Sequence, residues 1–298
     1  MLDAHSVRFR RGRIEVKRGM RSLLVPMLLL GGFIASGVPH AYAASPVREF
    51  AVTTPNSNPY GIAMGADRNM WFAEYNANKI GRINKAGSVT EFTLPVTSSY
   101  PIGITAGPDG NVWFTEYAGA KIGRITTAGT ISEFGVPTGG SLPSGITTGP
   151  DGNLWFTEYG VNKIGRLTTA GVFTEFDVPT SGSGPYAIAA GPDGKLWFTE
   201  VNVNKIGRIT TAGVFTEFGI TTGGSHASGI AAGPDGNLWF TELSNDKIGR
   251  ITPAGIVSEY AVPTTNSGVL GIASSGSDGN LWFTEYSTNK IGRISSKR

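Results

Sequence analysis

Short apolar runs separated by polar turns recur along this chain at a fixed spacing. One run, Trp-Phe-Thr-Glu or Trp-Phe-Ala-Glu, occurs six times, with tryptophans at Trp71, Trp113, Trp155, Trp197, Trp239 and Trp282. Successive tryptophans are 42 residues apart, and 43 at the last step. The runs are rich in β-branched and aromatic residues, which predicts strands, and they have no helical period. A repeat of this length predicts one supersecondary unit that stacks on its neighbours to bury a shared core.

Each repeat predicts four antiparallel strands. Their sequences are Gly-Ile-Ala or Gly-Ile-Thr, Leu-Trp-Phe-Thr-Glu, Lys-Ile-Gly-Arg-Ile and a segment such as Val172 to Phe176. Between the first two strands, a turn such as Gly107 to Gly110 supplies a proline that presets φ and a glycine that accepts positive φ. Four strands per repeat are typical of a propeller blade. The sequence therefore predicts one all-β domain in residues 44–298, a six-bladed β-propeller of four-stranded antiparallel blades.

The two ends of the array predict how the ring closes. Val47 to Phe50 has the pattern of a fourth strand, and the last repeat stops at Ile294, before its own fourth strand. We expect this N-terminal strand to close the last blade by backbone hydrogen bonds, because pairing removes an exposed strand edge.

Residues 1–43 predict a secretory signal peptide. Basic residues cluster from Arg8 to Arg21, the stretch from Leu23 to Val38 is apolar, and Ala41-Tyr42-Ala43 fits a signal peptidase site. The expected mature chain begins near Ala44 and is secreted or periplasmic. An uncleaved membrane anchor is the alternative, and Pro26 and the shortness of the apolar run disfavour it.

The charge balance changes when the predicted signal peptide is set aside. The full sequence has 25 Lys and Arg against 22 Asp and Glu, and residues 44–298 have 18 against 20. A slightly acidic mature chain makes nucleic acid an unexpected partner. The chain has no cysteine, which excludes disulfides, thiolate metal sites and a cysteine nucleophile. We expect a monomer with no membrane span after cleavage.

Residues present in every repeat are expected to serve the blade. A glutamate ends each Trp-Phe-Thr-Glu run and a lysine begins each Lys-Ile-Gly-Arg-Ile run, on either side of a four-residue loop. Cross-strand Glu–Lys ion pairs at exposed hairpins explain both series. The alternative is a ring of carboxylates that holds a divalent cation through oxygen ligands. The two series are Glu74, Glu116, Glu158, Glu200, Glu242 and Glu285, and Lys79, Lys121, Lys163, Lys205, Lys247 and Lys290.

Departures from the repeat indicate where function lies. If the Gly-Ile strand is innermost, the loop before it and the loop after each glutamate emerge on one face, the expected entrance of the channel. His226 is the only histidine of the expected mature chain, and it is either a solvated loop residue or a catalytic base. Residues at the entrance vary between blades, and we expect ligand contacts from Tyr60, Tyr100, Tyr186, Ser228 and Leu270.

The repeats also resemble a known family. Gly-Pro-Asp-Gly-Asn-Leu-Trp-Phe-Thr-Glu followed by Asn-Lys-Ile-Gly-Arg-Ile is similar to the virginiamycin B lyase, or streptogramin lyase, group of β-propellers. The resemblance covers Ser45 to Arg298. It implies a ring-opening elimination on a cyclic depsipeptide, in which Mg²⁺ polarises the ester, a histidine moves a proton, and a C–O bond breaks without water.

Carried over residue by residue, the resemblance places the family's histidines at Ser228 and Leu270 and one metal-binding carboxylate at Gly268. None of these three residues has the expected side chain. A second carboxylate is retained as Glu285, and the family's propellers have seven blades against the six expected here. The resemblance thus implies an Mg²⁺ site at Glu285 and Glu242, with His226 as a substitute base.

Three functions stay open at this stage. One is an exported Mg²⁺-dependent carbon–oxygen lyase that acts on a cyclic depsipeptide or ester. The second is a noncatalytic propeller without a metal, which binds a small molecule, peptide or glycan at its entrance. The third is a calcium-dependent enzyme of the six-bladed lactonase type, with ligands among Asn56, Asn58 and Asn266.

Overall fold

The computed structural model describes residues 49–274 and 279–297, and these residues form strands and no helix. The chain divides into two units, Met1–Glu49 and Phe50–Arg298, and the second holds every described strand. The all-β, six-bladed prediction is confirmed. The predicted signal peptide and its boundary after Ala43 lie outside the described residues. Within those residues, no helix is long and apolar enough to cross a membrane.

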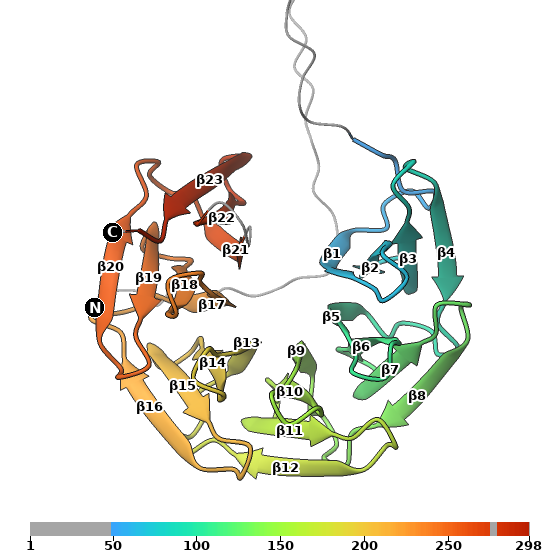
Figure 1. The fold of residues 1–298 in the computed structure, drawn as a ribbon, viewed down its shortest axis with the longest axis horizontal. Coiled ribbons are helices and arrows are strands. Elements are labelled where there is room, and N and C mark those ends of the chain that lie inside the picture. The colour runs from blue at the N-terminus through green and yellow to red at the C-terminus, as the bar shows by residue number, and fades with distance from the viewer. Residues whose placement is uncertain (1–48, 275–278, 298) are drawn as a thin grey trace, which may run out of the picture. The chain divides into compact units, whose positions relative to one another are not determined.

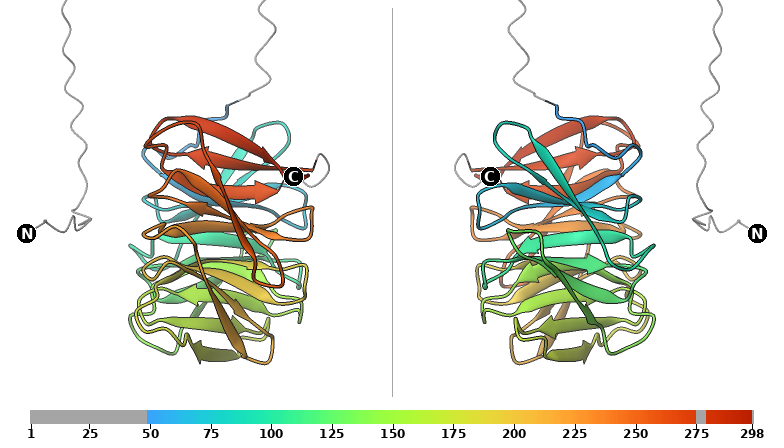
Figure 2. Two further views of the ribbon diagram at one scale, coloured as in Figure 1. Left: turned by 90° about the vertical axis from the view of Figure 1, so that its left-hand side faces the viewer. Right: turned by 90° about the vertical axis from the view of Figure 1, so that its right-hand side faces the viewer.

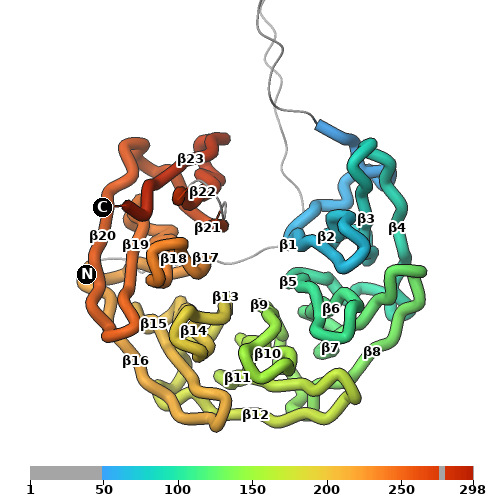
Figure 3. The backbone as a smooth tube through the Cα atoms, in the orientation of Figure 1, coloured from blue at the N-terminus to red at the C-terminus, as the bar shows by residue number. Residues whose placement is uncertain are grey.

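The strands form six antiparallel sheets that follow one another around an axis in chain order (Figures 1 and 3). The first blade is β1 (Pro59–Met64), β2 (Met70–Glu74), β3 (Lys79–Ile83) and β4 (Val89–Thr93); the second β5 (Pro101–Ala106), β6 (Val112–Glu116), β7 (Lys121–Ile125) and β8 (Ile131–Gly135); the third β9 (Pro143–Thr148), β10 (Leu154–Glu158), β11 (Lys163–Leu167) and β12 (Phe173–Asp177); the fourth β13 (Pro185–Ala190), β14 (Leu196–Glu200), β15 (Lys205–Ile209) and β16 (Phe215–Gly219); the fifth β17 (Ala227–Ala232), β18 (Leu238–Glu242), β19 (Lys247–Ile251) and β20 (Val257–Ala261); the sixth β21 (Val269–Ser274), β22 (Asn280–Glu285) and β23 (Lys290–Ser295).

The repeated turn and tryptophan are linked by a hydrogen bond, which explains why they recur together. The indole Nε1 of Trp113 donates to the carboxylate of Asp109 at 3.0 Å, and Asp109 also accepts from Asn111. Four other blades have an equivalent Trp–Asp hydrogen bond. These bonds fix the turn between the first two strands of the blade, because they satisfy a buried indole donor and orient the turn carboxylate.

The apolar core lies between neighbouring blades rather than inside each sheet. Trp71 of the first blade packs with Ile104, Val112 and Ile125 of the second, and the same combination recurs around the axis. On its outer side Trp71 stacks on Phe92 at 5.6 Å between ring centroids. The first five tryptophans are fully buried, so each blade requires a neighbour to complete its core.

The sixth sheet contains three strands in the described part of the chain. The predicted closing strand covers residues 47–50, of which 47 and 48 lie outside the described residues, while Glu49 and Phe50 form no strand. Closure of the last blade by this segment therefore stays a prediction. The described end of the segment contacts the first blade, where the Phe50 ring lies against Gly87.

Candidate functional site

The entrance face is where the sequence predicted it. Pro101, the first residue of the inner strand β5, pairs with Glu116, the last residue of β6, and Glu116 pairs with Lys121 at the start of β7. The loop that enters the inner strand and the hairpin loop after the glutamate therefore lie at the same end of each blade. Figure 2 shows the strands running between this face and the opposite one, which carries the Gly-Pro-Asp-Gly turns.

One position in the entrance loops has a left-handed backbone in every blade. It precedes the first residue of the inner strand, and glycine occupies it in the fourth and sixth blades. Tyr100, Leu142 and His226 hold the same conformation with φ of 52°, 47° and 48°. Large side chains in this region cost free energy that glycine does not, so these three residues are candidates for functional selection. Tyr100 and His226 are also residues that the sequence singled out at the entrance.

Six tyrosines form a cluster at the entrance. Tyr75 and Tyr100 have ring centroids 4.9 Å apart, and Tyr60 lies 6.3 Å from Tyr75. The hydroxyls of Tyr60 and Tyr186 are hydrogen-bonded at 2.6 Å, which joins the first blade to the fourth. The tyrosine cluster, as we call it from here, consists of Tyr60, Tyr75, Tyr100, Tyr117, Tyr159 and Tyr186.

Burial keeps the phenols of three cluster members neutral. Burial raises the pKa of Tyr75, with smaller contributions from Tyr100 and Tyr60. Burial likewise raises the pKa of Tyr117 and Tyr186. These three residues therefore offer aromatic faces and uncharged hydroxyls at neutral pH, and these suit a ligand with apolar and hydrogen-bonding groups rather than an anion.

Sequence reasoning named half of this cluster. Tyr60, Tyr100 and Tyr186 were predicted as ligand contacts, and the structure brings all three together through Tyr75 and a direct hydrogen bond. Three members were missed, all in hairpin loops. The sequence contained a signal for them, because the residue after the repeated glutamate varies between blades. It is tyrosine in four blades, and Val201 and Leu243 in the other two. The missed members are Tyr75, Tyr117 and Tyr159.

The predicted Glu–Lys ion pairs across the hairpins are wrong. Lys79 and Glu74 are opposite each other in register, but the Lys79 Nζ is 2.7 Å from Glu91 on β4. The lysine turns to the outer edge of the blade, where a second carboxylate and a threonine hydroxyl can both contact it, and the glutamate lies buried beneath the loop. The equivalent lysines pair with Glu133, Asp177, Glu217 and Glu259.

Five of the six repeated glutamates are buried acids whose carboxylate oxygens have no hydrogen-bond partner among the described residues. Both carboxylate oxygens of Glu116 lack a hydrogen bond, since the nearby Ser99 hydroxyl donates instead to the Val96 carbonyl at 3.0 Å. Burial disfavours the charged form and raises the pKa to about 7 for Glu74, Glu116 and Glu242 and to about 8 for Glu158 and Glu200. These groups are therefore largely protonated at slightly acidic pH, and they are not an exposed ring of carboxylates.

The other predicted site residues occupy the part of the entrance formed by the fifth and sixth blades. His226 is exposed, and its Nδ1 is 2.8 Å from the Ser244 hydroxyl. Ser228 is buried, its hydroxyl has no partner among the described residues, and its carbonyl accepts from Thr199 at 3.1 Å. The Leu270 carbonyl accepts a matching bond from Thr241 at 2.8 Å. These residues lie where they were expected, but the positions of Ser228 and Leu270 hold no titratable side chain.

The residues proposed as metal ligands do not fit a magnesium or calcium site. Glu242 is fully buried with a raised pKa, and Glu285 accepts a hydrogen bond from the Thr288 hydroxyl at 3.2 Å. Across the part of the chain that the structure describes, no group of three or more His, Asp or Glu side chains gathers in a way that could hold a metal ion. Ca²⁺ takes about six to eight oxygen ligands, and Mg²⁺ is usually held by one or two charged carboxylates together with several waters. Asn56, Asn58 and Asn266 lie in loops with left-handed backbone conformations.

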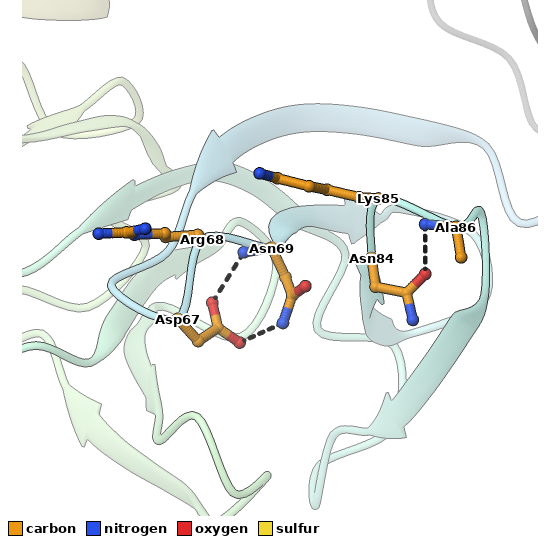
Figure 4. Close-up of a pocket in the computed structure, with 6 residues that line it drawn as sticks. All are labelled: Asp67, Arg68, Asn69, Asn84, Lys85 and Ala86. Atoms are coloured by element: carbon orange, nitrogen blue, oxygen red, sulfur yellow. Dashed lines mark hydrogen bonds between the residues drawn. The ribbon is translucent and has the colours of Figure 1, made fainter.

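One pocket of the surface lies away from the entrance, on the first blade. Figure 4 shows a shallow pocket between the turn at Asp67 to Asn69 and the turn at Asn84 to Ala86. Asp67 is held there by two hydrogen bonds from Asn69. Both turns belong to the face opposite the entrance, so this pocket is separate from the tyrosine cluster.

Comparison with known proteins assigns the fold and its repeats to one family. The model of the virginiamycin B lyase family matches residues 38–171 and again residues 146–298. The chain belongs to the virginiamycin B lyase family. A virginiamycin B lyase from Staphylococcus aureus is 45% identical with a TM-score of 0.80, over 82% of this chain and 83% of that one.

Two further members of the virginiamycin B lyase group align equally well. A streptogramin B lyase is 40% identical with a TM-score of 0.81, over 84% of this chain and 83% of that one. A catalytically inactive histidine-to-alanine variant of the Staphylococcus aureus virginiamycin B lyase, solved with quinupristin, is 45% identical with a TM-score of 0.81, over 84% of this chain and 85% of that one. Membership of the virginiamycin B lyase family is therefore shown by sequence and by fold together.

Proposed function

We propose that this chain is a ligand-binding propeller that holds a small cyclic peptide or depsipeptide against the tyrosine cluster. The observation that carries the proposal is the hydrogen bond of 2.6 Å between the Tyr60 and Tyr186 hydroxyls, with Tyr75 and Tyr100 packed beside them. Aromatic faces and neutral hydroxyls on a rigid scaffold match a ligand that has apolar side chains and many amide groups. The related lyase solved with quinupristin supports this ligand class.

The side chains at the entrance favour binding of a ligand over catalysis. Proton transfer needs a titratable group within hydrogen-bond reach of the reacting atom, and Ser228 and Leu270 stand at the positions that the family resemblance assigns to histidines. Glu242 is buried without a partner, and the described carboxylates do not gather into a metal site. The geometry thus supports recognition better than catalysis.

A second candidate is a carbon–oxygen lyase that uses His226. Two observations favour it: the family membership, and the contact of 2.8 Å between His226 Nδ1 and the Ser244 hydroxyl, which orients the ring at the entrance. In that case His226 would remove the proton next to the ester, and the carboxylate would leave as the C–O bond breaks.

The test uses quinupristin as the probe. Binding is measured by calorimetry, and ring opening is followed by chromatographic retention, because an elimination leaves the mass unchanged while hydrolysis adds the mass of water. We expect binding without ring opening, weakened by Tyr60→Phe or Tyr186→Phe and retained in Tyr286→Phe, which lies outside the cluster. Ring opening that is lost in His226→Ala would replace this proposal with the lyase, and absence of binding would contradict both.

We also propose that the chain is exported to the periplasm or the medium after cleavage behind Ala43. The support is the order of basic, apolar and small residues in residues 1–43. N-terminal sequencing of the exported protein tests it. A first residue at Ala44 is expected, and an exported protein that retains residues 1–43 would contradict the cleavage.

A further inference from the structure

The first blade has an apolar face that no described part of the chain covers. Ile62 is 61% exposed, whereas Ile104 at the same position of the second blade is 9% exposed. Ile62, Met70 and Ile83 line a surface hollow of about 360 Å³ together with Phe50, and Arg68 and Lys85 lie at its margin. In the second blade the matching residues, Ile104, Val112 and Ile125, enclose Trp71 of the blade before it. We call such a set of residues, which encloses a tryptophan of the preceding blade, a tryptophan socket. The hollow on the first blade is a tryptophan socket that no described tryptophan fills.

The sixth blade has a tryptophan that lies in no socket of the described residues. Trp282 is 41% exposed, although the other five tryptophans are fully buried in the socket of the next blade. Ile291 on the same blade is 66% exposed, and its counterpart Ile122 is fully buried. The Gly271 position, which in other blades lies tightly against a carbonyl of the next inner strand, meets only its own Thr284 hydroxyl. The opening beside β1 and β21 is visible in Figures 1 and 3.

Phe50 and Thr54 contact the first blade in the way that residues of a preceding blade do at the other interfaces. The Phe50 ring covers Gly87 as Phe92 covers Gly129 at the next interface. Thr54 donates through its backbone N–H and its hydroxyl to Glu91 at 2.7 and 2.6 Å. Where the second blade meets the third, Thr138 makes the same two bonds, at 3.0 and 2.6 Å, to Glu175 of the third blade. Phe50 and Thr54 thus occupy the positions that the outer strand of a preceding blade, and the loop after it, occupy at the other interfaces.

The sixth blade cannot move into this place without breaking the other interfaces. At the inner radius the Thr115 hydroxyl donates to the Ser144 carbonyl of the next blade at 2.8 Å. At the outer radius Arg82 donates to the Thr127 carbonyl of the next blade at 2.8 Å. Bonds at both radii fix the angle between blades, and closing six blades into a ring would widen every outer contact. The cost recurs at each interface, so an added element covers the two faces at a smaller cost.

We propose that the opening between β1 and β21 is a docking site for one further blade of the same repeat, supplied by another polypeptide. Such a blade places its tryptophan in the hollow at Ile62, Met70 and Ile83 and offers a socket to Trp282. It also supplies a fourth strand at the edge of β23, where the described residues place none. The five interfaces inside the chain show that these two kinds of face are complementary. The added blade also completes the ring around the tyrosine cluster.

The experiment supplies a blade of known sequence. Residues 214–253 are added to the full chain as a synthetic peptide, and in a second form they are fused after Arg298. Trp282 reports docking, because it is the exposed tryptophan of the six, and Trp282→Phe identifies its emission. We expect acrylamide to quench Trp282 in the chain alone and to lose access to it in the fused form, which also melts at a higher temperature.

Two matched variants separate docking from nonspecific effects. Ile62→Asp should change the melting temperature of the chain alone very little, because Ile62 is exposed, and should remove the gain in the fused form. A fused segment carrying Phe240→Asp should also fail to protect Trp282. Trp282 protected from acrylamide in the chain alone, or a large loss of stability in Ile62→Asp alone, would show that the ring closes on itself and would overturn the proposal. A fused blade that leaves Trp282 quenchable would overturn it as well.

Discussion

The hydroxyl of Tyr60 lies 2.6 Å from the hydroxyl of Tyr186, although 126 residues separate them in the chain. Tyr60 is the second residue of the inner strand of the first blade and Tyr186 the second residue of that of the fourth, so the hydrogen bond spans the entrance. Tyr60 is 47% exposed, whereas Tyr186 is half-buried, which leaves Tyr60 as the partner that a ligand can reach and displace.

This pair can be tested by a double-mutant cycle. Tyr60→Phe and Tyr186→Phe should each lower the free energy of unfolding by about 0.5–1.5 kcal/mol, because each removes the same hydrogen bond. The double variant should cost less than the sum of the two, since the bond can be lost only once. Chemical denaturation measures all four proteins. Additive effects would show that the two hydroxyls do not interact in solution.

The buried glutamates predict a stability that falls as pH rises. Their folded-state pKa is about 7 for Glu116 and about 8 for Glu158, above the usual value of 4.5. Between pH 4.5 and about 8 the unfolded chain has released these protons and the folded chain still binds them, so the free energy of unfolding decreases with pH and then levels off. Melting temperatures at constant ionic strength should show this slope. Glu116→Gln should reduce it, and a flat or rising profile in this window would contradict the assignment.

The outer carboxylates predict a second, separate pH window. Burial opposes ionisation of Glu91, but hydrogen bonds from Lys79 and Thr54 outweigh it and lower the pKa to about 2. This stabilisation is complete above pH 4.5 and is lost as pH falls toward 2, which is the opposite sign to that of the buried glutamates. The most stable pH is therefore expected near 4 to 5. Glu91→Gln should reduce the acid limb, to which Glu217 and Glu259 also contribute through their lowered pKa values, and should leave the limb above pH 4.5 intact.

One blade lacks a bond that its neighbours have, and a single substitution should supply it. The Thr138 hydroxyl donates to Glu175 at 2.6 Å, but valine occupies the matching position 96, and the Oε1 atom of Glu133 is buried without a partner. Val96→Thr should raise the free energy of unfolding by about 1 kcal/mol, and Thr138→Val should lower it by a similar amount. Thermal unfolding of both variants checks the pair. A destabilised Val96→Thr would refute the repeat-based argument.

The left-handed backbone at His226 predicts that glycine is tolerated there better than alanine. His226 has φ of 48°, so His226→Gly should relieve backbone strain and be neutral or stabilising, despite losing the contact with Ser244. His226→Ala keeps the strain and loses the contact, and it should be the less stable variant. Comparing their melting temperatures tests the point. Equal stability of the two variants would indicate that the backbone conformation is not held in solution.

The sequence predicted the blades well because their determinants are local. Turn residues, strand propensity and the spacing of Trp113 from Asp109 all act within a few positions, and each is repeated, so an accidental match is averaged out. The partners of the charged residues were predicted incorrectly. Lys79 lies opposite Glu74 in register, but it forms its ion pair with Glu91 on the next strand, and Glu74 stays buried. The strand register alone does not determine which of the two carboxylates the lysine contacts.

The sequence by itself determined the repeat, the strands, the face that carries the loops and the absence of histidines at Ser228 and Leu270. Only the tertiary structure decided that Tyr60 meets Tyr186, that the repeated glutamates are buried, and that Trp282 lies uncovered. The physical reason is range. Strands and turns depend on neighbours in the chain, whereas burial and contacts across the axis depend on the angle between blades, which many weak contacts at every interface set together.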